Sequence, residues 1–223
     1  VVGHSMGEVA AAHVAGALTL SDAVRIIVQR SRLLQQALDQ FSDGGAMAAL
    51  RVSAEQAAEL IRGCEDRVWI TVHNSPSYTV LSGDREVLEG LIAGLRKQKI
   101  GGRLMNVPGA AHTPRLEPMG RQLQATLEGI QPQAARIPFY STIAGESIDG
   151  RQLDAAYWGH TVCRQVRFAP AIDRLSQDGF RAFVEVGPHP LLTAAVTQCV
   201  EHRNEEAVVL PSLRRDDGDR EAM

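Results

Sequence analysis

The sequence has few cysteines, few aromatic residues, no long apolar run and no large charge imbalance. Its three cysteines are odd in number and include no Cys-x-x-Cys pair, which is typical of a cytoplasmic protein and argues against a disulfide framework or a zinc site. The net charge is −3, with both signs scattered along the chain, which argues against nucleic acid or a membrane surface as the main partner. No apolar run approaches the ~20 residues of a membrane span.

Small apolar residues, above all alanine, are abundant instead. Hydrophobic residues make up 44% of the 223 residues, whereas aromatic residues make up 4%. A chain of this length and apolar content can bury a sizeable core, as one large domain or one and a half. This composition favours a helix-rich α/β protein.

The most informative stretch lies at the beginning of the chain. Gly3-x-Ser5-x-Gly7 is a nucleophile-elbow pattern, in which a strand turns sharply at a strained serine and a helix begins. We expect both glycines to be required sterically, because the turn brings neighbouring backbone too close for a Cβ. The serine oxygen would lie at the N-terminus of the helix, where backbone N–H groups favour developing negative charge.

Only Val1 and Val2 precede this pattern, so most of the strand expected to carry Ser5 is missing. We therefore expect the chain to be a piece of a longer one. We also expect the 223 residues alone to be poorly stable and nearly inactive.

The hydrophobic periodicity after the elbow predicts a long amphipathic helix to about residue 40. Its predicted apolar stripe consists of Val24, Ile27, Val28, Leu34 and Leu38. In the next segment, 46–107, the period of the apolar residues predicts elements in the order strand, helix, strand, strand, helix, strand. This is the order of the ferredoxin-like unit. Its predicted elements are 47–52, 53–61, 68–72, 78–81, 84–99 and 103–107.

The remaining periodicity predicts a second part of a larger α/β unit. Helices are predicted at 118–127, 153–158, 166–176 and 191–200. Strands are predicted at 138–143, 182–186 and 208–213, the middle one buried. We therefore divide the chain into a large subdomain (1–45 and 108–207), an inserted small subdomain (46–107) and a terminal linker (208–223).

A serine nucleophile needs a general base, most often a histidine on a loop. Two of the seven histidines, His112 and His189, lie on Gly/Pro-rich loops after predicted strands, and both remain candidates. No acidic residue stands out as a third member of a triad. Arg30, 25 positions after Ser5, could hold a carboxylate in a bidentate pair, although spacing alone favours a solvated arginine.

Five segments are informative when taken together: Gly3–Glu8, Arg30–Arg32, His112–Pro114, Val184–Leu191 and Leu210–Arg215. Together they resemble the acyltransferase domains of type I modular polyketide synthases. The related enzymes of fatty acid synthesis are the malonyl-CoA:acyl-carrier-protein transacylases. The resemblance runs over essentially the whole chain, and the end of the sequence resembles the linker that follows such domains. The implied fold is a hydrolase-like large subdomain with an inserted ferredoxin-like small subdomain.

The resemblance implies roles for individual residues. Ser5 would be the nucleophile and His112 the general base and acid, and Arg30 would bind the free carboxylate of a malonyl-type substrate. The backbone N–H of Met6 would form half of the oxyanion hole, whose other half in the family comes from a glutamine that this chain does not contain. Thr161 replaces the family's asparagine whose backbone carbonyl orients the histidine, and this carbonyl contact would survive the replacement.

The resemblance also places Asn74 in the cleft. The segment before the histidine, Gly109-Ala110-Ala111, matches neither the His-Ala-Phe-His of malonyl-selective members nor the Tyr-Ala-Ser-His of methylmalonyl-selective ones. Met6 differs from the glutamine typical of the latter. Ala111 would leave space for an α-substituent, whereas prevalence within the family favours malonyl.

The implied activity is transfer of a malonyl-type unit from coenzyme A to an acyl carrier protein through an acyl-serine intermediate. It would need no metal or bound cofactor, only coenzyme A thioesters and the carrier protein's phosphopantetheine arm. Its partners would be that carrier protein and the ketosynthase and linker domains of the same polypeptide. The alternatives are a serine thioesterase or esterase and a catalytically silent scaffold fragment.

Overall fold

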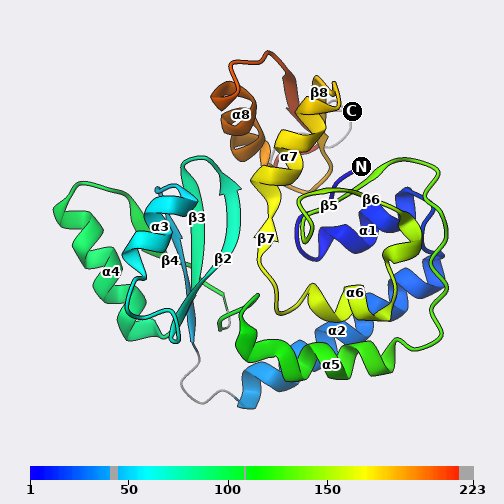
Figure 1. The fold of residues 1–223 in the computed structure, drawn as a ribbon, viewed down its shortest axis with the longest axis horizontal. Helices are drawn as coiled ribbons and strands as arrows, with labels where there is room; N and C mark the ends of the chain where they lie inside the picture. Colours follow the sequence, from blue (N-terminus) through cyan, green and yellow to red (C-terminus); the bar gives the residue numbers. More distant parts are fainter. Residues whose placement is uncertain (41–44, 108, 216–223) are drawn as a thin grey trace.

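The computed structural model describes residues 1–40, 45–107 and 109–215, and Figure 1 shows their arrangement. A small subdomain with its own sheet lies beside a larger, helix-rich one. The predicted α/β fold class is therefore confirmed.

The small subdomain has the predicted ferredoxin-like topology. Its strands lie in the order β4-β1-β3-β2, all antiparallel, and α3 and α4 bury a separate apolar core that includes Leu50, Leu81 and Leu88. The elements are β1 (Ala46–Leu50), α3 (Ala54–Leu60), β2 (Val68–Ser75), β3 (Tyr78–Gly83), α4 (Arg85–Lys97) and β4 (Gly102–Leu104). The Ser53 side chain begins α3 with a capping box, as its sequence suggests.

One strand of this sheet comes from outside the small subdomain. The prediction of one helix over 166–176 was wrong at its start, because β7 (Val166–Arg167) pairs in parallel with β2 before α7 (Phe168–Gln177) begins. Val166 pairs with Val72 at an edge that local periodicity cannot reveal. This strand connects the sheet of the small subdomain to the large subdomain (Figure 1).

The large subdomain is built around helices packed on a small amount of sheet. Its core contains buried Val9, Ile26, Leu123 and Trp158, one from each of the four helices that surround it. Val2 forms a parallel bridge with Tyr140 of β5 just before the elbow. The elements are α1 (Gly7–Val14), α2 (Leu20–Gln40), α5 (Glu117–Thr126), β5 (Phe139–Ser141), β6 (Glu146–Ile148) and α6 (Ala155–His160), with 3₁₀ turns at Pro114–Leu116 and Gly150–Gln152.

The predicted apolar stripe of α2 was partly wrong. Ile27 and Leu34 pack against the core, but Val24 and Val28 are 53% and 47% exposed, and the Leu38 side chain lies outside the described residues. Apolar residues lie on two faces of this helix, and the positions of α1 and α5 decide which face is buried. The buried face carries Ala23, Ile26 and Leu33.

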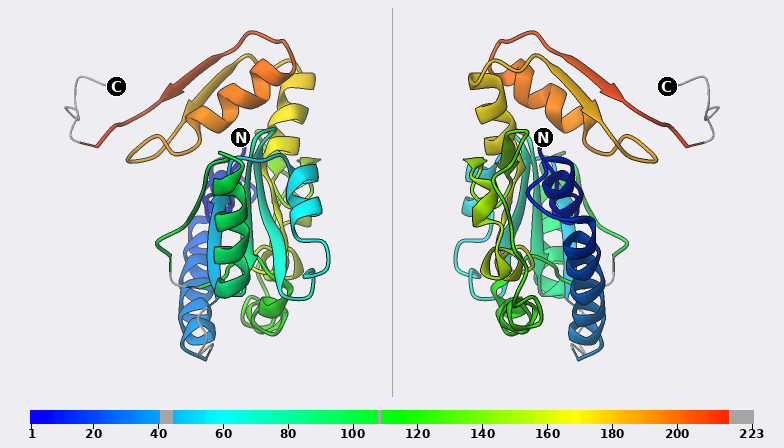
Figure 2. Two further views of the ribbon diagram at one scale, coloured as in Figure 1. Left: turned by 90° about the vertical axis from the view of Figure 1, so that its left-hand side faces the viewer. Right: turned by 90° about the vertical axis from the view of Figure 1, so that its right-hand side faces the viewer.

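The strand predicted to be buried at 182–186 is β8 (Ala182–Glu185), and its burial was predicted wrongly. Within the part of the chain that the structure describes, it pairs with β9 (Val208–Pro211) alone, in a two-stranded parallel sheet, and Val184 is 63% exposed. Figure 2 shows this sheet and α8 (Thr193–His202) at one end of the molecule. The predicted linker at 208–223 thus begins with a paired strand, and its residues 216–223 lie outside the described residues.

Candidate active site

The elbow at Ser5 has the strained backbone that its pattern predicts. Ser5 has a φ of 51°, in the left-handed region that residues with a Cβ rarely adopt. A Cβ on Gly3 would lie 2.3 Å from the backbone nitrogen of Glu8, so only glycine fits there. The same prediction for Gly7 was wrong: a Cβ there would have no described atom within 4 Å, because Gly7 begins α1 at the exposed surface.

The serine is paired with one of the two candidate histidines. His112 Nε2 lies 2.8 Å from Ser5 Oγ, across 107 positions of sequence. His112 has a φ of 59° and is buried at the start of the segment that leads into α5. His189, in contrast, is exposed, and its Nδ1 accepts a hydrogen bond from the backbone of Arg215. The structure thus resolves the two alternatives in favour of His112 as the partner of Ser5.

A backbone carbonyl holds the other side of the His112 ring. Nδ1 donates to the carbonyl of Arg164 at 3.2 Å, in the turn that follows α6. The sequence had pointed to the carbonyl of Thr161, three positions earlier on the same turn. The Thr161 carbonyl also acts on the ring, and both carbonyls raise the pKa of His112. With Nδ1 protonated, Nε2 is the nitrogen that can accept a proton from Ser5.

The surroundings of His112 strongly favour the neutral imidazole. Burial, the Arg30 guanidinium and nearby His4 together lower the pKa of His112 to about 4, against the opposing effect of the two carbonyls. A neutral histidine beside a serine hydroxyl can act as a general base at physiological pH.

Arg30 lies on the core-facing side of α2, between the turns that carry Ile26 and Leu33. Burial lowers the pKa of Arg30, and the positive charge of Arg30 in turn lowers the pKa of His112. Among the described residues, no carboxylate forms an ion pair with this guanidinium. A partly buried, unpaired cation beside a serine–histidine pair can bind an anionic group brought by a ligand.

His4 and Asn74 form a second polar contact next to Ser5. His4 Nε2 lies 2.9 Å from Asn74 Oδ1, and the His4 ring packs edge-on against Phe168 at 5.2 Å between centroids. Asn74 comes from the small subdomain, so this contact joins the two subdomains beside the nucleophile. Asn74 also lines a cavity of about 560 Å³ together with Tyr78.

The remaining predicted residues are Met6, which directly follows Ser5, and the segment Gly109-Ala110-Ala111, which directly precedes His112. Met6 is 51% exposed, and within the described ranges no acceptor faces its backbone N–H. Gly109, Ala110 and Ala111 are half-buried, and Ala111 packs against the apolar cluster that includes Tyr140 and Phe168.

Glu8 is an important residue that the sequence reasoning did not single out. Its side chain is 1% exposed, and its carboxylate accepts hydrogen bonds from the Thr142 hydroxyl at 2.8 Å and the Tyr157 hydroxyl at 2.7 Å. An acidic residue in the first turn of a helix made mostly of small and apolar residues was the available signal.

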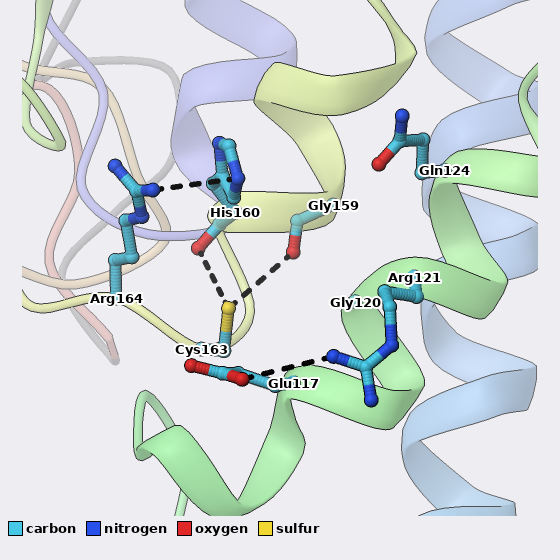
Figure 3. Close-up of a pocket in the computed structure, with 8 residues that line it drawn as sticks. All are labelled: Glu117, Gly120, Arg121, Gln124, Gly159, His160, Cys163 and Arg164. Atoms are coloured by element: carbon cyan, nitrogen blue, oxygen red, sulfur yellow. Dashed lines mark hydrogen bonds and ion pairs between the residues drawn. The ribbon is translucent and has the colours of Figure 1, made fainter.

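Helices α5 and α6, which flank His112 and its carbonyl partner, touch through their backbones. A Cβ on Gly159 would lie 2.6 Å from the Gly120 carbonyl oxygen, and a Cβ on Gly120 would meet the Gly159 oxygen at the same distance. Figure 3 shows these glycines beside a cavity of about 240 Å³ that the Arg164 and Cys163 side chains also line. The contact holds α5, which His112 precedes, close to α6, and the turn after α6 carries the backbone carbonyl of Arg164 that accepts from His112 Nδ1.

We expect Gly159→Ala to destabilise the fold by about 1–3 kcal/mol, because the added methyl must push α5 and α6 apart. The matched control is Gly94→Ala on α4, where a Cβ would have no described atom within 4 Å and the helix would gain slightly. Thermal unfolding of the two variants checks this. Equal melting temperatures would contradict the close contact.

Residues 1–40, 45–107 and 109–215 contain neither a cluster of metal-binding side chains nor a membrane-spanning helix. No three histidine, cysteine, aspartate or glutamate side chains there gather closely enough to hold a metal ion. None of the helices in those ranges is long and apolar enough to cross a membrane.

Comparison with known proteins identifies relatives over the full chain. Residues 1–223 match the family described as acyl transferase domain. The chain is 42% identical over 225 residues to erythronolide synthase EryA2 of Saccharopolyspora erythraea, covering 100% of this chain and 6% of that protein. It therefore spans a small fraction of the length of this relative.

Solved structures agree with the fold described above. The acyltransferase domain from module 8 of the salinomycin polyketide synthase superposes with a TM-score of 0.90 at 37% identity, covering 98% of this chain and 51% of that one. The malonyl CoA-acyl carrier protein transacylase of Coxiella burnetii shares the fold, with a TM-score of 0.82 at 24% identity over 94% of this chain and 66% of that one. By its match over every residue and its likeness to these domains, the chain belongs to the acyl transferase domain family of modular polyketide synthases.

Proposed function

We propose that this chain transfers a malonyl-type acyl group from coenzyme A to the phosphopantetheine arm of an acyl carrier protein. The observation that carries this proposal is the Arg30 cation, which has no ion-pair partner among the described residues and whose charge acts on the hydrogen-bonded pair of Ser5 and His112. A nucleophile and a base suit acyl transfer, and a fixed cation suits an acyl group that carries its own carboxylate.

The first half of the reaction forms an ester on Ser5. His112 Nε2 takes the proton of Ser5 Oγ while Oγ attacks the thioester carbonyl carbon, and the backbone N–H of Met6 donates to the resulting oxyanion. The tetrahedral intermediate collapses by breaking the carbon–sulfur bond. The departing thiolate of coenzyme A takes the proton from His112.

The second half is the same sequence with another thiol. His112 takes the proton of the phosphopantetheine thiol, its sulfur attacks the ester carbonyl, and Ser5 leaves and recovers the proton from His112. Because a thiolate departs readily, a base oriented by the carbonyls of Arg164 and Thr161 suffices without an acidic third member. This is a ping-pong reaction through an acyl-enzyme.

Specificity is assigned to residues around the pair. Arg30 would hold the free carboxylate of the acyl group by a bidentate pair. Met6 and the small segment Gly109-Ala110-Ala111 would border the α-carbon, with space beside Ala111 for a substituent. Asn74, whose Oδ1 lies 2.9 Å from Nε2 of His4 next to the nucleophile, would contact the thioester arm.

The partners that follow are the carrier protein and the neighbouring domains of one polypeptide, including a ketosynthase and its linker. This assignment rests on the modular polyketide synthases among the relatives.

Intact-protein mass spectrometry tests the proposal. The natural protein that contains this chain, and its Ser5→Ala variant, are mixed with malonyl-, methylmalonyl- and acetyl-CoA in competition. A malonyl- or methylmalonyl-sized adduct that is absent from Ser5→Ala is expected, and its mass identifies the extender unit. Accumulation of free acid without a transferable adduct would indicate a thioesterase, and no reaction would indicate a silent scaffold.

The pH dependence of acylation follows from the lowered pKa of His112. A histidine with an ordinary pKa near 6.5 would lose its basic form below that pH, whereas His112, at about 4, stays neutral well below it. We expect kcat/KM for Ser5 acylation to be flat from pH 8 to about 5 and to fall only near pH 4. An acidic limb centred near 6.5 would contradict the described environment.

A further inference from the structure

The buried carboxylate of Glu8 is held by donors from two separate segments. Thr142 donates to it from both its backbone N–H and its hydroxyl, the latter at 2.8 Å. Tyr157 donates from its hydroxyl at 2.7 Å. Burial raises the pKa of Glu8, and these hydrogen bonds oppose that rise.

The Tyr157 hydroxyl is fully used in this cluster. Its proton goes to Glu8, and its oxygen lies 2.7 Å from the hydroxyl of Ser141, which can donate to it. Ser141 Oγ in turn accepts from the backbone nitrogens of Ile143 and Ala144, at 3.1 and 3.0 Å. The cluster therefore has a consistent direction of donation, which favours one rigid arrangement.

Together with the reacting pair, this cluster forms a closed ring of contacts that runs from Ser5 through Glu8, Tyr157 and the Arg164 carbonyl to His112 and back to Ser5. Glu8 lies three positions after Ser5, on the helix that the elbow begins. Tyr157 lies on α6, and the turn after α6 presents the Arg164 carbonyl to His112 Nδ1. His112 Nε2 then returns to Ser5 Oγ.

We propose that Tyr157 is a positioning residue for the Ser5–His112 pair, which acts through its hydrogen bond to Glu8. The hydroxyl joins the elbow helix to α6, so that the nucleophile and the carbonyl that orients the base keep a constant separation. This inference rests on the proposed function.

Loss of the hydroxyl should loosen α6 without unfolding it. The Trp158 indole still donates to the Leu153 carbonyl at 2.8 Å, and the Gly120–Gly159 contact still holds α6 against α5. A phenylalanine at 157 also keeps the edge-on packing of the ring against Trp158. The expected defect is therefore one of geometry at the reacting atoms.

The test compares Tyr157→Phe with Tyr140→Phe in the intact natural protein. Tyr140 is the matched control, because it is also buried and also donates its hydroxyl to a carboxylate, that of Asp178 at 2.7 Å, but this contact lies outside the ring. We expect Tyr157→Phe to lower the maximal rate of Ser5 acylation about tenfold, with KM nearly unchanged and the Tyr140→Phe rate near that of the wild type.

A fluorophosphonate probe, which labels activated serines regardless of acyl substrate, separates this inference from the proposed function. If the wild type reacts with the probe but takes no malonyl group, the proposed function fails while the role of Tyr157 is still measured by probe labelling. If Tyr157→Phe reacts with the probe as fast as Tyr140→Phe, the positioning role is overturned.

A double-mutant cycle supplies a second, independent criterion. If Tyr157 acts through Glu8, the double variant Glu8→Gln/Tyr157→Phe should react with the probe about as slowly as Glu8→Gln alone. Additive losses would mean that the two residues act separately and would overturn the proposed connection. Thermal unfolding of each variant verifies that the rates refer to folded protein.

Discussion

Replacing His112 with alanine is expected to slow acylation of Ser5 by roughly 10³-fold, with little change in KM. His112 is the only histidine described within hydrogen-bonding distance of Ser5 Oγ, and general-base catalysis contributes about 10²–10⁴ in rate. The loading rate from malonyl-CoA, followed by intact-protein mass spectrometry, measures the effect.

The matched control for this substitution is His189→Ala. His189 lies on the other Gly/Pro-rich loop that the sequence offered as a source of the base, but the structure shows it exposed and bonded to the backbone of Arg215. We expect His189→Ala to load at the wild-type rate. Comparable losses in the two variants, or normal loading by His112→Ala, would exclude the proposed pair.

Replacing Arg30 with alanine is expected to reduce malonyl loading by about 100-fold or more. Truncating one partner of a buried, hydrogen-bonded charge pair costs about 2–5 kcal/mol, because the substrate carboxylate would be left without its cation. Reaction of Ser5 with an uncharged ester should survive, since that substrate has no carboxylate to hold. This contrast separates a malonyl-type transferase from a simple esterase.

Two further measurements sharpen the prediction for Arg30. The control Arg32→Ala removes an exposed arginine from the same helix and should leave loading unchanged. Because the Arg30 cation lowers the pKa of His112, Arg30→Ala should also move the acidic limb of the rate profile to higher pH. If uncharged and malonyl substrates lose rate equally, the role of Arg30 in binding a carboxylate is wrong.

Local patterns in the sequence were sufficient for the small subdomain. Between 46 and 107 the apolar residues recur with the period of a strand in some segments and of a helix in others, which predicted the order of these elements. In the structure the strands pair in the order β4-β1-β3-β2. This was possible because the period of apolar residues depends on the geometry of each element alone. The elbow at Ser5 belongs to the same class, since its strained φ arises from a few neighbouring residues.

Predictions that depended on what packs against an element were less successful. The burial of β8 and the choice of the buried face of α2 were predicted from hydrophobicity, and both needed correction. The same limit affected β7, whose two residues form a strand only because the edge of β2 accepts them.

The sequence by itself determined the ferredoxin-like unit, the elbow at Ser5 and, through its motifs, the family to which the chain belongs. The residues alone left His112 and His189 as equal candidates, and the family resemblance favoured His112. The tertiary structure brought His112 within hydrogen-bonding distance of Ser5 and placed the Arg30 charge, which has no ion-pair partner among the described residues, where it acts on His112. It also showed the Arg164 carbonyl and the buried Glu8 behind the pair. The physical reason is the separation along the chain over which each effect acts. Periodicity and backbone strain act between neighbours in the chain, whereas the Ser5–His112 contact spans 107 positions and exists only when helices from distant segments pack together.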